Sequence, residues 1–290
     1  MYSEILVPTD GSAAAGTATE TALNLARRFD ASVRAITVVE RGTSPADVEP
    51  EVVEEATRRG EKTLATLEDR AADAGISATT QVIETAGPVH QTIGDYARDH
   101  DVDLIVMGTH GRTGLNRLVL GSVTERTLRT SPVPVLTVHE DVALDPDFEA
   151  VLVPTDGSDA ASVAADHGVA IAEAAGAAMH VVHAVDLAPV SGDFGSAELL
   201  TALEDAGQRA VDDVIGRAEA AGLRSVEASV LTGAPARAVL DYAEERDVDL
   251  IVMGTHGRTG LERYFLGSVT EKIVRVANVP VLTVSPPEER

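Results

Sequence analysis

The chain has 290 residues, of which 44% are hydrophobic, and its 23 basic and 47 acidic side chains give a formal net charge of −24. This length predicts two domains or one large one, and the lack of cysteine excludes disulfide scaffolds, thiolate metal sites and cysteine nucleophiles. Charged residues interrupt every long apolar stretch and the first residues are unlike a signal peptide, so we expect a soluble, cytoplasmic protein.

The predicted elements of the first half alternate between strands and helices. Strands are expected at Glu4–Val7, Ser32–Val39, Ile76–Glu84, Asp103–Met107 and Val133–Val138. Helices are expected up to Phe29 and at Asp47–Ala74, Val89–His100 and Ser122–Thr130, with Gly75 as a C-cap. This alternation predicts an α/β fold, a doubly wound parallel sheet of five strands covered by helices on both faces.

The second half repeats the first at a distance of 146 residues. Asp101–Leu115 and Asp247–Leu261 are identical, and VPTDGS occurs at Val7–Ser12 and again at Val153–Ser158. The same elements are therefore expected from a strand at Ala150–Val153 to one at Val279–Val284. We expect two domains, at 1–139 and 150–290, joined by an acidic, solvated linker at 140–149.

A glycine motif follows the fourth strand of each half. Gly108, Gly111 and Gly121-Ser122 have the spacing G-x2-G-x9-G-S, which recurs at Gly254, Gly257 and Gly267-Ser268. The first glycine is expected to let a ligand approach the backbone, and the second to open a loop that needs a positive φ. Ser122 is expected to cap the next helix, with Glu125 as its capping-box partner.

That helix start offers the amides of Ser122, Val123 and Thr124 at the positive end of the helix dipole, where a phosphate is favoured. The alternative is that the glycines only make turns and that Ser122 only caps the helix. The spacing differs from G-x4-G-K-[ST], so a P-loop is excluded.

Further candidates lie where other strands of the predicted sheet end, the edge at which doubly wound sheets bind ligands. Pro8, Thr9 and Asp10 follow the first strand, Val38 lies near the end of the second, and Met107 ends the fourth. An aspartate can accept hydrogen bonds from ribose, valine backbone groups can recognise an adenine edge, and methionine can cover its face. The alternatives are a turn or N-cap role for Asp10 and a core position for Met107.

Each half resembles a domain of the universal stress protein family, specifically its ATP-binding branch, over nearly its whole length. The resemblance rests on the complete glycine motif, the amino-terminal V-P-T-D and the P-V-L-T-V strand. It implies that Asp10 and Asp156 hold ribose or the adenine edge. It implies that Val38 and its counterpart Ala184 contact adenine through their backbone. The glycine motif would then surround the phosphates, with Mg²⁺ bridging them. The implied nucleotide-binding residues of the two halves are Pro8, Thr9, Asp10, Val38, Met107, Gly108, Gly111, Gly121, Ser122, Val123 and Thr124, and Pro154, Thr155, Asp156, Ala184, Met253, Gly254, Gly257, Gly267, Ser268, Val269 and Thr270.

Several nearby side chains are ambiguous. Arg112, Arg117, Arg258 and Arg263 lie in the motif loops and either offset phosphate charge or are simply solvated. His110 and His256 are more typical of exposed hydrogen-bonding residues than of catalysts, and neither half has the His, Asp and Glu spacing of a metal-hydrolysis centre. We therefore predict no catalytic residue and no protein ligand to a metal.

The last strand of each half is expected at a sheet edge, where unpaired backbone groups invite a partner. The resemblance implies antiparallel pairing of the two last strands within one chain, as a pseudo-dimer, with a homodimer of chains also open.

The acid-rich, lysine-poor composition indicates a halophilic protein, because molar salt screens self-repulsion. An ordinary acidic cytosolic protein is the alternative. The same negative charge argues against binding to nucleic acid or to a membrane surface.

The sequence thus favours an adenine-nucleotide-binding stress-response module. A slow ATPase or phosphoryl-transfer enzyme at the same site, and a nucleotide-free protein-interaction module, are the alternatives.

Overall fold

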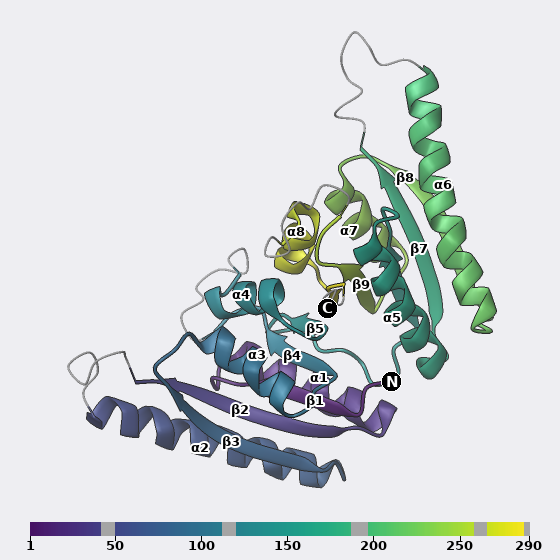
Figure 1. The fold of residues 1–290 in the computed structure, drawn as a ribbon. Helices are drawn as coiled ribbons and strands as arrows, with labels where there is room; N and C mark the ends of the chain where they lie inside the picture. Colours follow the sequence, from purple (N-terminus) through teal and green to yellow (C-terminus); the bar gives the residue numbers. More distant parts are fainter. Residues whose placement is uncertain (42–49, 112–119, 187–196, 258–265, 287–290) are drawn as a thin grey trace. The chain divides into compact units, whose positions relative to one another are not determined.

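The computed structural model describes residues 1–41, 50–111, 120–186, 197–257 and 266–286 (Figure 1). The chain divides into two compact units, Met1–Pro146 and Asp147–Arg290, which we call unit 1 and unit 2. In the described ranges, no helix is both long enough and apolar enough to cross a bilayer.

Unit 1 is a parallel sheet in the order β3-β2-β1-β4-β5, with four helices in its described part. Its strands are β1 (Glu4–Pro8), β2 (Ser32–Glu40), β3 (Ala78–Thr85), β4 (Leu104–Gly108) and β5 (Val135–Val138). Its helices are α1 (Ala13–Phe29), α2 (Pro50–Asp73), α3 (Val89–Asp99) and α4 (Ser122–Thr130).

Unit 2 repeats this architecture in the order β10-β9-β6-β7-β8, again with parallel neighbours. Its strands are β6 (Ala150–Pro154), β7 (Ala178–Val185), β8 (Val226–Thr232), β9 (Leu250–Gly254) and β10 (Val281–Val284). Its helices are α5 (Asp159–Ala175), α6 (Ala197–Ala220), α7 (Pro235–Glu245) and α8 (Ser268–Val276). The predicted doubly wound α/β fold is therefore confirmed for both halves.

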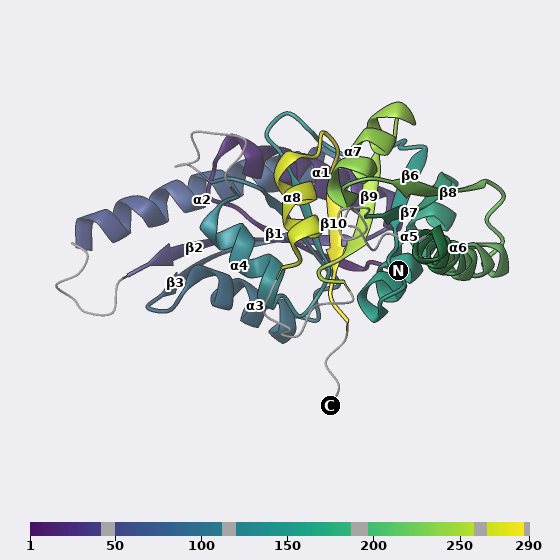
Figure 2. The ribbon, with the colours of Figure 1, turned by 90° about the horizontal axis from the view of Figure 1, so that it is seen from above.

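Helices cover both faces of each sheet. In unit 1, α1 packs on β1 and β4, α2 packs on β2 and β3, and α3 contacts α4. Figure 2 shows α1 and α2 on one side of the unit 1 strands and α3 and α4 on the other. Because β1 lies between β2 and β4, the chain winds outward in both directions from the centre, and the switch point is at the carboxyl ends of β1 and β4.

The centre of each sheet is fully buried. Ile5, Leu6 and Val7 of β1 are 0% exposed, and all five residues of β4 are buried. Asp103, just before β4, accepts hydrogen bonds from the backbone N–H groups of Ser3 (2.7 Å) and Glu4 (3.1 Å), which fixes the start of β1 beside β4.

Most predicted boundaries agree with the structure within a few residues, and the differences have local causes. The helix at Ser122–Thr130 is confirmed, and Gly75 follows α2 with φ +70°. The strand predicted from Val133 starts at Val135, because Val133 forms a turn with the Ser131 hydroxyl and Pro134 has no N–H.

The linker prediction is wrong at Leu144, which we expected to be solvated. Leu144 is 1% exposed. Its N–H donates to Thr21 (3.1 Å) and its carbonyl accepts from Asn24 (3.0 Å), so this part of the segment packs on α1.

Candidate functional site

Unit 1 has a cavity of about 390 Å³ at the carboxyl edge of its sheet. It lies at the switch point between β1 and β4, where an open α/β sheet is expected to bind a ligand. Its size is within the range of small-molecule sites. All eleven candidate residues of the first half border it: Pro8, Thr9, Asp10, Val38, Met107, Gly108, Gly111, Gly121, Ser122, Val123 and Thr124.

One wall of this cavity is the amino-terminal end of α4. The first hydrogen bond of the helix runs from the N–H of Glu125 to the carbonyl of Gly121 (2.8 Å), so the N–H groups of Ser122, Val123 and Thr124 have no acceptor within the helix. Because all three residues border the cavity, the helix end can bind an anion there.

The predicted capping box is wrong. Gly121 is the N-cap and Ser122 is the first helical residue, without a side-chain cap hydrogen bond. Glu125 instead accepts a hydrogen bond from Arg129 one turn later (2.6 Å). Glycine is acceptable at an N-cap, and this one is held by its N–H, which donates to the carbonyl of Thr109 (2.8 Å).

The glycines of the motif are required by close contacts that the sequence did not reveal. A β-carbon on Gly108 would lie 2.8 Å from the backbone of Ala14, so α1 rather than a ligand occupies that side. A β-carbon on Gly111 would lie 2.8 Å from Oδ2 of Asp10. Gly111 itself lies outside the left-handed region, and the loop that it opens, residues 112–119, lies outside the described residues.

Asp10 combines two roles. Its Oδ1 accepts the N–H of Ser12 (2.9 Å), and Ser12 in turn caps α1 by accepting the N–H of Ala15 (3.3 Å). Asp10 therefore shapes the turn after β1, as the alternative interpretation proposed, and also borders the cavity. The turn fixes the carboxylate beside the glycine loop.

Val38 borders the cavity near the end of β2. The carbonyl of Ile36 accepts the N–H of Thr9 (2.8 Å), which is the last contact between β2 and the chain leaving β1. Backbone groups alternate sides along a strand, so the N–H and carbonyl of Val38 point to the same side of β2 as the carbonyl of Ile36, which is the side of β1. Because β1 has ended at this level, these groups of Val38 point past its end. They are thus directed to the cavity that Val38 borders.

The opposite, apolar end of the cavity was not predicted. Ile36 of β2 and Val89 and Ile93 of α3 line it, and Ala15, Glu40 and His110 also border the cavity. The sequence analysis predicted site residues at strand ends, in the glycine loop and at the start of α4, but none on α3. The available signal was that α3 starts at the same edge of the sheet as those ends and carries Val89 and Ile93 four residues apart on one face.

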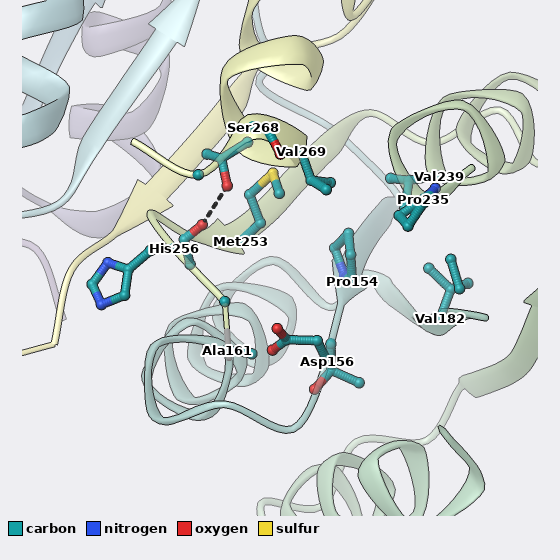
Figure 3. Close-up of a pocket in the computed structure, with 16 residues that line it drawn as sticks. Pro154, Asp156, Ala161, Val182, Pro235, Val239, Met253, His256, Ser268 and Val269 are labelled. Carbon is teal, nitrogen blue, oxygen red and sulfur yellow. Dashed lines mark hydrogen bonds between the residues drawn. The ribbon is translucent and has the colours of Figure 1, made fainter. Parts of the chain in front are cut away.

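Unit 2 has the equivalent cavity, of about 270 Å³ (Figure 3). Its candidate residues all border it: Pro154, Thr155, Asp156, Ala184, Met253, Gly254, Gly257, Gly267, Ser268, Val269 and Thr270. Figure 3 shows Pro154, Val182, Pro235 and Val239 gathered on one side, and Met253 extending toward the start of α8. Here too the first hydrogen bond of the helix runs from Glu271 to Gly267 (2.8 Å).

Asp156 repeats the arrangement of Asp10. Its Oδ1 accepts the N–H of Ser158 (3.0 Å), and a β-carbon on Gly257 would lie 2.3 Å from its Oδ2. The two units thus share one design of carboxylate, glycine loop and helix start.

Two candidate groups have structural partners. The hydroxyl of Thr124 donates to the carbonyl of Gly108 (2.8 Å), and that of Thr270 donates to Gly254 (2.9 Å; Figure 3). For these threonines, the backbone N–H remains the group available to an anion.

Met107 is 5% exposed, so it is a core residue that also borders the cavity.

His110 and His256 border the cavities of unit 1 and unit 2. Nδ1 of His110 contacts the Thr109 hydroxyl (2.9 Å), which also contacts Nδ1 of His139 (2.9 Å). In unit 2 the ring of His256 points away from the apolar side chains (Figure 3). Arg112, Arg117, Arg258 and Arg263 lie outside the described residues.

The described residues contain no group of three or more His, Cys, Asp or Glu that could hold a metal ion.

The whole chain was compared with known proteins. The family model of the universal stress protein family matches it twice, at residues 1–139 and 147–285. The chain belongs to the universal stress protein family. It is a tandem member, with one family domain in each half.

Its relatives include both single-domain and tandem proteins. A universal stress protein of Methanocaldococcus jannaschii is 40% identical over 145 residues, which are 49% of this chain and 85% of that protein. One of Thermus aquaticus is 42% identical over 140 residues, 47% of this chain and 98% of that protein. The crystal structure of a universal stress protein from Archaeoglobus fulgidus matches 97% of this chain and 98% of that chain, with a TM-score of 0.75 and 26% identity.

Proposed function

We propose that this universal stress protein binds an adenine nucleotide, ATP, ADP or AMP, in the cavity of each unit. The bound state would then serve a regulatory or protective role in the stress response. The observation that carries the proposal is the start of α4 and of α8, where three consecutive amides face a cavity that also contains an aspartate and an apolar end.

The cavity offers a distinct environment to each part of such a ligand. The amides of Ser122, Val123 and Thr124 suit the phosphates, because anions are stabilised at a helix amino terminus. Asp10 suits the ribose hydroxyls, which donate hydrogen bonds to a carboxylate. Ile36, Val89 and Ile93 suit the base, while the backbone of Val38 supplies the polar groups for its edge. Mg²⁺ would be bound through the phosphate oxygens.

Ser122 allows a direct test of the amides. Gly121 has ψ 139°, which is compatible with a following proline, and proline is tolerated at the first helical position. Ser122→Pro removes the N–H, whereas Ser122→Ala removes only the hydroxyl. Because a hydrogen bond to a charged group contributes about 1.5–3 kcal/mol, Ser122→Pro should weaken binding in unit 1 about 10–100-fold. Ser268→Pro and Ser268→Ala form the same pair in unit 2, after Gly267 with ψ 142°.

The measurement is isothermal titration of the full chain with ATP, ADP and AMP in high-salt buffer. The wild type should bind two equivalents, and each proline variant one equivalent at the original affinity. Nucleotide released on denaturing the purified protein gives an independent readout. A folded wild type that binds none of the three nucleotides would overturn the proposal.

A further inference from the structure

Unit 1 contains a second cavity, of about 220 Å³, beside the first. It lies between the end of β2 and the first turns of α2, and it shares Asp10, Val38 and Glu40 with the first cavity. The remaining residues around it are Thr37, Val39, Val52, Val53, Ala56, Arg59 and Gly60. The two cavities therefore meet at Asp10 and Glu40.

The second cavity borders Thr37, a small side chain. The hydroxyl of Thr37 donates to the carbonyl of Thr9 (3.0 Å), and its methyl group lies against Gly60 of α2. A β-carbon on Gly60 would be 2.9 Å from that methyl, so strand and helix are in close contact at this point. Toward the start of α2 the space between them remains open.

In unit 2 a larger side chain stands at the same position. His183 lies 146 residues after Thr37, and its Nδ1 bonds to the carbonyl of Thr155 (2.8 Å), the counterpart of Thr9. The ring is buried against Gly207 of α6, where a β-carbon would lie 2.5 Å from Cδ2 and 3.1 Å from Cγ. The imidazole thus lies between strand and helix at the position where unit 1 has only the smaller threonine side chain.

This difference bears on which ligand each unit accepts, given the proposed nucleotide sites. Asp10 borders both cavities of unit 1, so a ribose held by Asp10 would have its 2′ and 3′ oxygens where the cavities meet. We propose that unit 1 accepts an adenine nucleotide that carries a further group on a ribose hydroxyl, with that group in the second cavity. Unit 2 accepts only the unsubstituted nucleotide.

The side chains around the second cavity indicate the chemistry of that group. The lining is mixed: Val39, Val52, Val53 and Ala56 are apolar, whereas Asp10, Thr37, Glu40 and Arg59 are polar, so an aromatic group that also carries a polar atom fits it. The carboxylates of Asp10 and Glu40 repel a second phosphate. Arg59 can place its guanidinium over an aromatic ring. Arg59 is the tenth residue of α2, and the tenth residue of α6 is Ala206, so unit 2 lacks this group as well.

The test compares AMP with 2′(3′)-O-(N-methylanthraniloyl)-AMP, a fluorescent ribose ester, in chains with one active unit. Gly257→Val closes unit 2, because its side chain would collide with Asp156, and Gly111→Val closes unit 1 in the same way. We expect unit 1 to bind the ester about as tightly as AMP. Unit 2 should bind the ester at least about tenfold more weakly than AMP, because its substituent meets the His183 ring.

A reciprocal exchange then tests the cause. In unit 1, Thr37→His should raise the ratio of the dissociation constant of the ester to that of AMP to the value found in unit 2. In unit 2, His183→Thr should lower the same ratio. Thr37→Ser, which keeps the hydroxyl and adds no volume, is the matched control. The ratio separates exclusion of the substituent from a general loss of binding, and circular dichroism verifies folding.

The outcomes distinguish the two proposals. If unit 1 binds AMP but excludes the ester as strongly as unit 2 does, or if neither exchange changes the ratio, this inference is overturned and the nucleotide sites stand. A folded chain that binds neither compound overturns both.

Discussion

The carboxylate of Asp10 lies against Gly111, so a side chain at Gly111 would have to displace it. A β-carbon on Gly111 would be 2.8 Å from Oδ2 of Asp10, and the corresponding distance between Gly257 and Asp156 is 2.3 Å. Two residues that are 101 positions apart in the sequence thus lie next to each other beside each cavity.

Gly111→Ala should displace the carboxylate of Asp10 and weaken nucleotide binding in unit 1 about tenfold, on the scale of one lost hydrogen bond. The matched control is Gly16→Ala in α1, where a β-carbon would have no atom within 4 Å. The control should bind normally and gain about 0.5–1 kcal/mol of stability. Titration calorimetry and urea unfolding measure both effects, and normal affinity in Gly111→Ala would contradict the argument.

Asp103 and Asp249 are expected to matter for stability rather than for binding. Each accepts two backbone N–H groups at the start of a central strand: Asp103 from Ser3 and Glu4, and Asp249 from Glu149 (2.8 Å) and Ala150 (2.9 Å). Asp103→Ala should cost about 0.5–1.5 kcal/mol of unfolding free energy, the net contribution of a typical hydrogen bond, because the Ser3 bond is exposed and the Glu4 bond only partly buried. Because the chain has no tryptophan, circular dichroism in urea is the suitable readout.

The control for this variant is Asp99→Ala, which removes an exposed carboxylate from the last turn of α3. It should change stability by no more than about 0.5 kcal/mol. Equal effects of Asp99→Ala and Asp103→Ala would show that only net charge is involved.

His180 should make the stability of unit 2 depend on pH. It is 7% exposed, and its Nδ1 lies 3.1 Å from the Tyr242 hydroxyl. Burial lowers the pKa of His180; the carboxylate of Glu227 opposes this effect and Arg246 adds to it. The unfolded chain therefore binds the proton more readily than the folded one, so this contribution to stability is complete above the ordinary histidine pKa of about 6.5 and is lost as the pH falls toward the folded value.

His180→Gln should flatten the fall in melting temperature below about pH 6.5, since glutamine can still bond to Tyr242 but does not titrate. In unit 1 the same position is Arg34, paired with Glu4 (2.7 Å), so no equivalent histidine contribution arises there. Parallel pH profiles for the wild type and His180→Gln would refute the assignment. His90 and His167 also have pKa values lowered by burial, and they serve as further substitutions for comparison.

The net charge of −24 predicts that salt stabilises the fold. The screening length falls from about 10 Å at 0.1 M salt to about 3 Å at 1 M, which removes most of the repulsion between surface carboxylates. The melting temperature should rise markedly from 0.1 M to 1 M KCl. The double variant Glu54→Gln, Glu61→Gln on the exposed face of α2 should melt higher at low salt and respond less to KCl. A melting temperature that stays constant across this range would rule out a high-salt adaptation.

The repeat and the alternating pattern were enough to predict the fold. β1, β4 and α4 lie within a residue of their predicted ranges, because buried runs such as Leu104–Gly108 have clear limits on both sides. The sequence predicted the last residue of β5 correctly, but its first residue was predicted at Val133 instead of Val135, because a turn at Ser131 and a proline precede the strand.

The site was predicted less completely, and the reason is that its contacts are long-range. Local sequence suggested Ser122 as the N-cap, whereas the contact between Gly121 and Thr109 decides the cap. Likewise, the closeness of Gly111 to Asp10 and the contribution of Val89 and Ile93 to the cavity depend on tertiary packing. The motif spacing predicted which residues border the cavity, whereas tertiary packing determines the contacts that each of them makes.

The hydroxyl of Thr124 joins the first turn of α4 to the last residue of β4, and Thr270 does the same in unit 2. Through this link the N–H groups at the helix start are tied to a strand that is buried at every residue. An incoming anion would meet groups already oriented toward it, so little ordering entropy would be lost on association. If the cavities bind a nucleotide as proposed, the first turns of α4 and α8 should therefore change little between the free and the bound state.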